Sequence, residues 1–139
     1  MIMKNGVIKL DEDFIVDWAF TTNDLKRVGG KSLIEPVVTN GSYESYKSKP
    51  IDFMGKKIIS TLYFERGKIT RLSIYLSTGQ TGWTENIAKQ EQQKKTDQDA
   101  WLKSIFNQDA PYDFDWGKVE SVYDPRSCSS AVVITFNGR

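Results

Sequence analysis

The chain has 139 residues, of which 39% are hydrophobic and 12% aromatic, so it is long enough to bury its own core and is predicted to form a single domain over residues 1–139. Its 19 Lys and Arg nearly balance its 18 Asp and Glu, which argues against an overall basic field that would hold nucleic acid or an anionic membrane. With no His and one Cys, histidine-based catalysis, the usual zinc sites and an internal disulfide are excluded, and we expect neither a cofactor nor enzymatic activity.

The N-terminal third predicts short elements. Residues 6–20 mix apolar and acidic side chains and predict one or two short strands. The stretch 21–29 begins with Thr, carries an early Asp and late Lys and Arg, and ends in Gly, which is the order typical of a short helix. A turn at Asn40-Gly41 is followed by a predicted strand over residues 42–47. No apolar run reaches secretory or membrane-spanning length, so we expect a soluble, cytoplasmic protein.

The clearest pattern is a hairpin over residues 56–77. Residues 57–65 are rich in β-branched and aromatic side chains, and residues 69–76 alternate apolar and polar. Between them, Gly67 suits a positive φ in a hairpin loop of the G1-bulge type. This pattern predicts a half-buried antiparallel hairpin in which Leu72, Ile74 and Leu76 share the buried face.

From residue 82 the pattern becomes helical. Trp83, Ile87, Trp101 and Leu102 fit one stripe, but residues 89–99 contain no apolar side chain. We therefore favour two helical segments meeting near the N-cap signal at Thr96 over one long helix, with a face formed by the side chains of Trp101, Leu102, Ile105 and Phe106 docking on a sheet.

The last third predicts a second hairpin. Residues 117–123 and 129–136 are strand-like, and the turn residues 124–127 separate them. Together these elements predict an α+β fold, with an antiparallel sheet of about four to six strands and helices packed on one face.

Few side-chain groups resemble a chemical site. Asp113 and Asp115 would lie roughly 7 Å apart on one strand face, which suits acid–base work or a cation, but a solvated loop explains them better. The acidic run 11–13 lacks calcium-loop spacing, and Cys128 lacks a base. The segment 29–32 ends like a phosphate loop but lacks its upstream Gly, so no P-loop is predicted.

Basic and aromatic residues interleave on the first hairpin. On a sheet face they could stack nucleic-acid bases, but the signature of RNA-recognition strands is missing, and an ordinary solvated face is the favoured interpretation. The residues concerned are Lys56, Lys57, Tyr63, Phe64, Arg66, Lys68, Arg71 and Tyr75.

Charge is distributed unevenly along the chain. Residues 49–71 hold six basic side chains and two acidic ones, whereas residues 97–124 hold seven acidic and two basic. The acidic stretch also contains Tyr112, Phe114 and Trp116. Aromatic anchors among carboxylates are the ingredients of a surface that binds a basic protein partner.

The order of these pieces resembles that of small bacterial immunity proteins encoded beside polymorphic or contact-dependent toxins. The resemblance covers residues 10–136 and rests on structural motifs, with Cys128 standing where Gly is expected in the final hairpin turn. The motifs are Tyr43-x-x-Tyr46, Gly55-Lys56, Leu62-Tyr63-Phe64, the turn 65–69, Trp83, Trp101-Leu102 and the segment from Asp115 to Ser127.

The resemblance implies a non-catalytic protein that binds a cognate toxin and occludes its active site. Many such toxins are nucleases with basic clefts, so the expected contacts are acidic and aromatic, with a rim of two further acids. The contacts are Tyr112, Asp113, Asp115, Trp116 and Glu120, and the rim residues are Asp109 and Asp124. Alternatives are a nucleic-acid-binding module that uses the hairpin over residues 56–75, and a regulatory protein-interaction protein.

Overall fold

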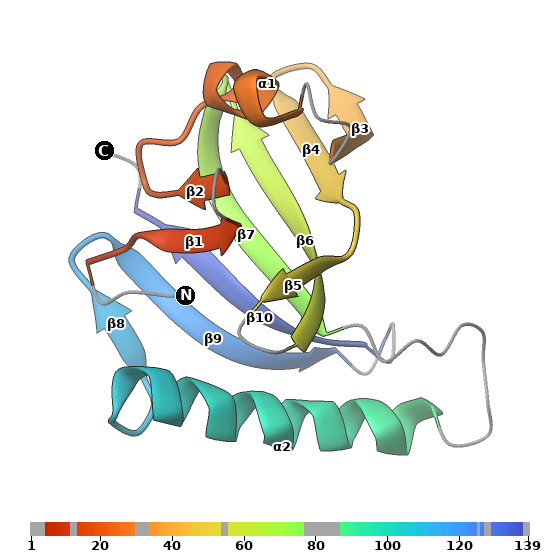
Figure 1. The fold of residues 1–139 in the computed structure, drawn as a ribbon, viewed down its shortest axis with the longest axis vertical. Coiled ribbons are helices and arrows are strands. Elements are labelled where there is room, and N and C mark those ends of the chain that lie inside the picture. The colour runs from red at the N-terminus through yellow and green to blue at the C-terminus, as the bar shows by residue number, and fades with distance from the viewer. Residues whose placement is uncertain are drawn as a thin grey trace.

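Figure 1 shows the fold in a computed structural model, which describes residues 5–11, 14–29, 34–53, 56–76, 87–124, 126 and 129–137. Strands dominate the described part of the chain. The elements are β1 (Ile8–Asp11), β2 (Phe14–Val16), α1 (Thr22–Gly29), β3 (Ile34–Asn40), β4 (Tyr43–Ser48), β5 (Ile51–Phe53), β6 (Lys56–Glu65), β7 (Lys68–Leu76), α2 (Ile87–Phe106), β8 (Tyr112–Phe114), β9 (Gly117–Asp124) and β10 (Ser129–Phe136).

One large antiparallel sheet organises these elements. Its strands follow the order β3-β4-β6-β7-β10-β9-β8, and β5 also pairs with β6, which makes eight strands in the described residues. The expectation of an α+β fold with four to six strands and helices packed on one face is therefore wrong: the fold is mostly β, and α2 is the one long helix among the residues that the structure describes. The sequence pattern missed β3, β5 and β8. β5 and β8 have only three residues each, too few to show a side-chain period.

The first predicted hairpin is confirmed as β6–β7. Leu72, Ile74 and Leu76 are buried, as the alternation predicted. The loop differs from the G1-bulge type, because Arg66 and Gly67 both have positive φ and Glu65 pairs directly with Lys68. Two left-handed residues between paired strands make a two-residue turn of the I′ type, whose twist matches that of the strands.

The N-terminal elements also follow the sequence. β1 and β2 form a separate two-stranded ribbon, and its inward side chains join the core; they are Ile8, Leu10, Phe14 and Val16. At the start of α1, the backbone amide of Thr21 donates to the Asp24 carboxylate (3.0 Å), and the Asp24 amide donates back to the Thr21 hydroxyl (3.3 Å). This reciprocal pair is a capping box, and it explains why the helix begins there.

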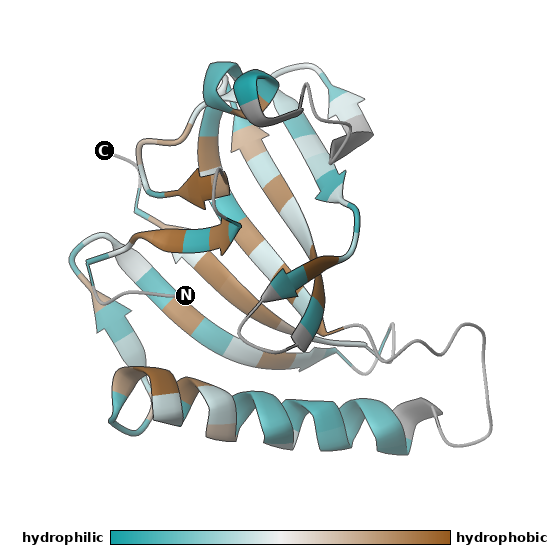
Figure 2. Ribbon diagram, in the orientation of Figure 1, coloured by the Kyte–Doolittle hydropathy of each residue, from teal (hydrophilic) through white to brown (hydrophobic). Residues whose placement is uncertain are grey.

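Helix α2 is continuous over its 20 residues, so the expected break near Thr96 does not occur. Its C-terminal part docks as predicted: Leu102 and Phe106 are fully buried, and Trp101 and Ile105 pack against the core. Figure 2 shows the difference along the helix, hydrophilic over its first half and hydrophobic toward its end. The first half lacks apolar residues but still has a buried side, which is formed by the polar residues Glu91, Lys94 and Gln98.

These polar residues continue the spacing of the apolar face. Positions 91, 94, 98 and 102 are three, four and four residues apart, so they lie on one side of the helix. The Glu91 carboxylate accepts hydrogen bonds from the Tyr75 hydroxyl (2.9 Å) and from Lys94 Nζ (3.2 Å), and Lys94 Nζ also donates to the Tyr75 hydroxyl (2.8 Å). The charges are therefore paired and hydrogen-bonded, which is the condition under which buried charges are tolerated.

Several features singled out in the sequence lie outside the described residues. They are residues 12 and 13 of the acidic run, residues 30–32 of the rejected phosphate loop, Trp83, Cys128, and residues 125 and 127 of the final turn.

Candidate functional site

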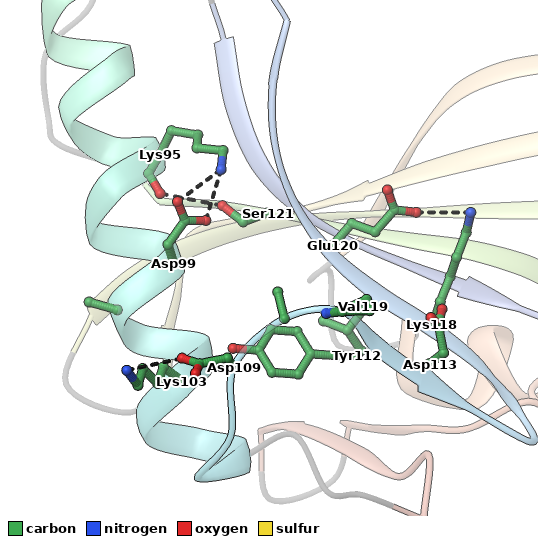
Figure 3. Close-up of a pocket in the computed structure, with 13 residues that line it drawn as sticks. Lys95, Asp99, Lys103, Asp109, Tyr112, Asp113, Lys118, Val119, Glu120 and Ser121 are labelled. Atoms are coloured by element: carbon green, nitrogen blue, oxygen red, sulfur yellow. Dashed lines mark hydrogen bonds and ion pairs between the residues drawn. The ribbon is translucent and has the colours of Figure 1, made fainter.

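A groove of about 630 Å³ lies between the C-terminal half of α2 and the β8–β9 hairpin. Figure 3 shows the helix forming one wall and the two strands the other. Its volume is in the range of small-molecule sites, but seven of its thirteen lining residues are charged. The lining residues are Lys95, Asp99, Ala100, Lys103, Asp109, Ala110, Pro111, Tyr112, Asp113, Lys118, Val119, Glu120 and Ser121.

Each lysine of the groove already has an acidic partner. Lys95 lies 2.8 Å from Asp99 along the helix. Lys103 lies 3.0 Å from Asp109, across the turn between α2 and β8; the hydrogen bond and the charge of Asp109 raise the pKa of the Lys103 ammonium. The third pair is formed within β9 by Lys118 and Glu120, 3.1 Å apart. All three pairs are at least partly exposed to water, where ion pairs contribute little to stability.

Asp113 is the carboxylate of the groove that is not paired with one of these lysines. It faces Lys118 across the β8–β9 ladder, but the Lys118 ammonium is paired with Glu120. Within the described ranges, Asp113 has no hydrogen bond or ion pair, and its residue is exposed. Three lysines and four acids line the groove, so its one unmatched charge is negative and available to a partner.

Tyr112 forms part of the floor. Only 4% of its surface is exposed, and its ring lies 4.9 Å from that of Phe106, measured between centroids. Its hydroxyl donates to the backbone carbonyl of Gln108 (3.1 Å). Burial raises the pKa of this hydroxyl, and the negative charges of Asp109 and Asp99 raise it further.

The structure brings together four of the seven predicted contact residues. Asp109, Tyr112, Asp113 and Glu120 line the groove, and the remaining three (Asp115, Trp116 and Asp124) do not. Asp115 lies in the turn after β8, so it does not share a strand face with Asp113, and the pairing that acid–base work or a cation would need is not formed. At the other end of β9, Asp124 accepts a hydrogen bond from the backbone amide of Arg126 (2.9 Å).

The expected role of the aromatic residues as surface anchors does not fit their burial. Trp116 exposes 8% of its surface and stacks on Phe114, with ring centroids 5.2 Å apart and planes 5° from parallel. Its ring also lies near that of Phe136, with centroids 5.9 Å apart. Trp116 and Tyr112 therefore support the groove from inside the core, and its surface is mainly charged.

Sequence reasoning missed the helical wall of the groove. Lys95, Asp99 and Lys103 lie four residues apart and so project from one side of α2. That spacing was visible in the sequence, but it falls within the stretch interpreted as a junction between two helices. A continuous helix was needed to see that these three side chains share a face.

The basic hairpin does not present the stacking surface that its composition suggested. Phe64 is 1% exposed and belongs to the core. The Arg71 guanidinium lies over the Tyr63 ring, 4.2 Å from its centroid, and the Tyr75 hydroxyl is bonded to Glu91. Since the aromatic rings are occupied within the chain, this geometry does not favour nucleic-acid binding at the hairpin.

In the described residues, no three His, Cys, Asp or Glu side chains gather as a metal site would need. The helices of the same part of the chain include none that is long and apolar enough to span a membrane. No family model, curated protein or solved structure matches the chain.

Proposed function

We propose that this chain is a non-catalytic immunity protein that binds a cognate bacterial toxin through the groove between α2 and β8–β9 and occludes the toxin's active site. The observation that carries the proposal is the exposed, unpaired carboxylate of Asp113 in a groove whose lysines are all paired with acids. A basic side chain of the partner would supply the missing positive charge.

The charge of the surrounding surface supports a basic partner. Asp99 on the helix, Asp109 in the turn after it and Glu120 on β9 also line the groove, so that with Asp113 it holds four carboxylates against three lysines. They would attract a positively charged cleft before contact and so speed association, in the way that charge complementarity acts in protein complexes. A nuclease toxin binds phosphates through Lys and Arg, and acidic side chains of an inhibitor can occupy those same residues.

The rigidity of the groove also supports a preformed binding surface. The helical wall is fixed to the sheet through Leu102 and Phe106, both fully buried. The strand wall is fixed through the stacked Phe114 and Trp116 rings. A surface that does not have to be ordered on binding loses less entropy when the complex forms.

Co-expression with the product of the adjacent reading frame tests this proposal. We expect the two proteins to co-purify as a complex and the toxicity of the neighbour to be suppressed. Asp113→Lys combined with Glu120→Lys should weaken both effects. Asp52→Lys is the matched control, because Asp52 is an exposed acid of β5 whose ion pair with Lys57 (3.2 Å) lies outside the groove. A neighbour that neither co-purifies nor loses toxicity would contradict the proposal.

A further inference from the structure

Strand β9 has an outer edge that extends beyond its neighbour β8. The β8 ladder reaches only from Gly117 to Val119 on β9, where Tyr112 is the last paired residue. β9 continues to Asp124 and pairs with β10 throughout. In the described parts of the chain, no strand pairs with residues 120–124 of β9 on the side away from β10.

The direction of the backbone groups on this edge follows from Ser130. Its amide donates to the Glu91 carboxylate (3.2 Å), so it does not point toward β9. Ser130 faces Tyr123 in the β9–β10 ladder, and in an antiparallel pair the two facing residues direct their backbone groups the same way, either both toward or both away from each other. The backbone N–H and C=O of Tyr123 therefore point outward, and by alternation so do those of Ser121.

These outward groups have no partner in the described structure. No hydrogen bond involves the backbone of Ser121 or Tyr123 on the side away from β10. Ser121 lines the groove, and its side chain is held on the helix side: its hydroxyl donates to the Lys95 carbonyl (3.4 Å) and accepts from Gln98 Nε2 (3.2 Å). Helix and strand are thus in contact at Ser121, and the groove opens beside this contact, next to the unpaired strand groups.

The two edges of the sheet differ in the features that interrupt strand pairing. β3 carries Pro36 and a bulge between Pro36 and Val38, both of which interrupt pairing with a further strand. β9 has neither feature in residues 120–124. Its outer face there presents Glu120, Val122 and Asp124, an acidic, an apolar and an acidic residue, all exposed.

We propose that the edge of β9 at Ser121 and Tyr123 receives an extended segment of the partner protein as an added strand, which continues the line of β8. The segment carries basic, apolar and basic side chains at alternate positions, opposite Glu120, Val122 and Asp124, because facing side chains of paired strands interact directly. A second copy of this chain fits less well, since two such edges would bring acidic side chains together. The nature of the partner rests on the function proposed above.

The test is an NMR titration of the isotope-labelled full chain with a defined probe, the capped peptide TKTVTKT. We expect the amide signals of Ser121 and Tyr123 to shift, and their hydrogen exchange to slow, at millimolar peptide. The same peptide with glutamate in place of lysine should shift neither signal. No shift at these two amides with the lysine peptide would overturn the proposal, as would concentration-dependent shifts in the free chain, which would mean that a second copy occupies the edge.

Two variants test the backbone pairing. Tyr123→Pro removes an outward amide and leaves the β9–β10 hydrogen bonds in place, so it should weaken peptide binding about tenfold, the effect of roughly one hydrogen bond. Tyr123→Val keeps the amide and should bind within about twofold of the natural chain, by the same reasoning. Equal affinities of the two variants would overturn the proposal.

A second arm needs no change in the protein. Alternate residues of a strand direct their N–H groups to opposite sides. One peptide is therefore N-methylated on its odd residues and a second on its even residues. The peptide whose methyl groups face β9 should lose binding, and the other should keep it. Binding of both peptides would contradict strand addition. If the peptide binds as expected while the adjacent gene product does not, the function proposed above fails and the strand site stands. If the gene product binds equally to the Tyr123→Pro and Tyr123→Val variants, the function proposed above stands and the strand site fails.

Discussion

The backbone amide of Ser130 donates a hydrogen bond to the buried carboxylate of Glu91, 3.2 Å away, at the point where strands β7 and β10 part. The two strands pair from Ile74 and Val132 onward into the sheet. In the described residues beyond this pair, Tyr75 and Leu76 of β7 pair with β6, whereas residues 129–131 of β10 pair with β9. Helix α2 places the Glu91 carboxylate between the diverging ends of β7 and β10. There the carboxylate accepts the hydrogen bond from the Ser130 amide, which β7 is no longer close enough to accept.

Removing the negative charge of Glu91 should destabilise the fold strongly. Glu91→Gln leaves the buried Lys94 ammonium without its charge partner, and such a loss lowers the free energy of unfolding by about 3 kcal/mol or more. Asp99→Asn is the control, because it breaks the exposed pair with Lys95 and should cost less than about 1 kcal/mol. Urea unfolding followed by circular dichroism measures both. Equal losses would show that the buried pair does not fix the helix to the sheet.

Stability should fall in alkaline solution, and Tyr112 should contribute to the fall. Its pKa is raised in the folded chain, chiefly by burial, as is that of Tyr46. Below about pH 10, the ordinary tyrosine pKa, both states are protonated and the contribution is constant. Above it the unfolded chain loses the proton first, so stability declines as pH rises toward the folded pKa.

Tyr112→Phe isolates this effect. The variant should lose about 1 kcal/mol at neutral pH, because the hydrogen bond to the Gln108 carbonyl is lost. Between pH 9 and about pH 11, however, its free energy of unfolding should decline less steeply than that of the natural chain. Parallel pH dependences would show that Tyr112 is not held protonated by its surroundings.

Gly6 should be far less tolerant of substitution than Gly41. Both have positive φ, +89° and +62°, so Ala at either position pays a backbone cost of about 1 kcal/mol. A Cβ at position 6 would also lie 2.7 Å from a ring carbon of Trp116, whereas one at position 41 meets nothing within 4 Å. Gly6→Ala should therefore lower the thermal midpoint well below that of Gly41→Ala. Similar midpoints would mean that the N-terminal segment does not pack on the Trp116 ring.

The sequence predicts the hairpins correctly and the extent of the sheet poorly. The strand that contains Leu72, Ile74 and Leu76 could be predicted because the alternation of apolar and polar residues is visible within a short stretch of sequence. β8 has only three residues, so its membership in the sheet depends on the neighbouring β9, which no local pattern reveals.

The candidate site was predicted only in part, for a similar reason. Asp113 and Glu120 were singled out from the acidic stretch, but the opposite wall was not. Polar residues at 91, 94 and 98 concealed the buried stripe of α2, because side chains of this kind ordinarily mark an exposed face. Their burial depends on contacts with Tyr75, Ser121 and Ser130, which are distant in the chain.

The most direct test of the central claim is the association rate with the adjacent gene product, measured by stopped flow for the natural chain and for Asp113→Lys combined with Glu120→Lys. The account predicts association slowed about tenfold or more at low salt, and a smaller difference at high salt because the charges are screened. Circular dichroism should show that the double variant is still folded at the temperature of the measurement. Asp52→Lys should associate at the natural rate. A double variant that associates as fast as the natural chain would contradict the claim that this groove meets a basic partner.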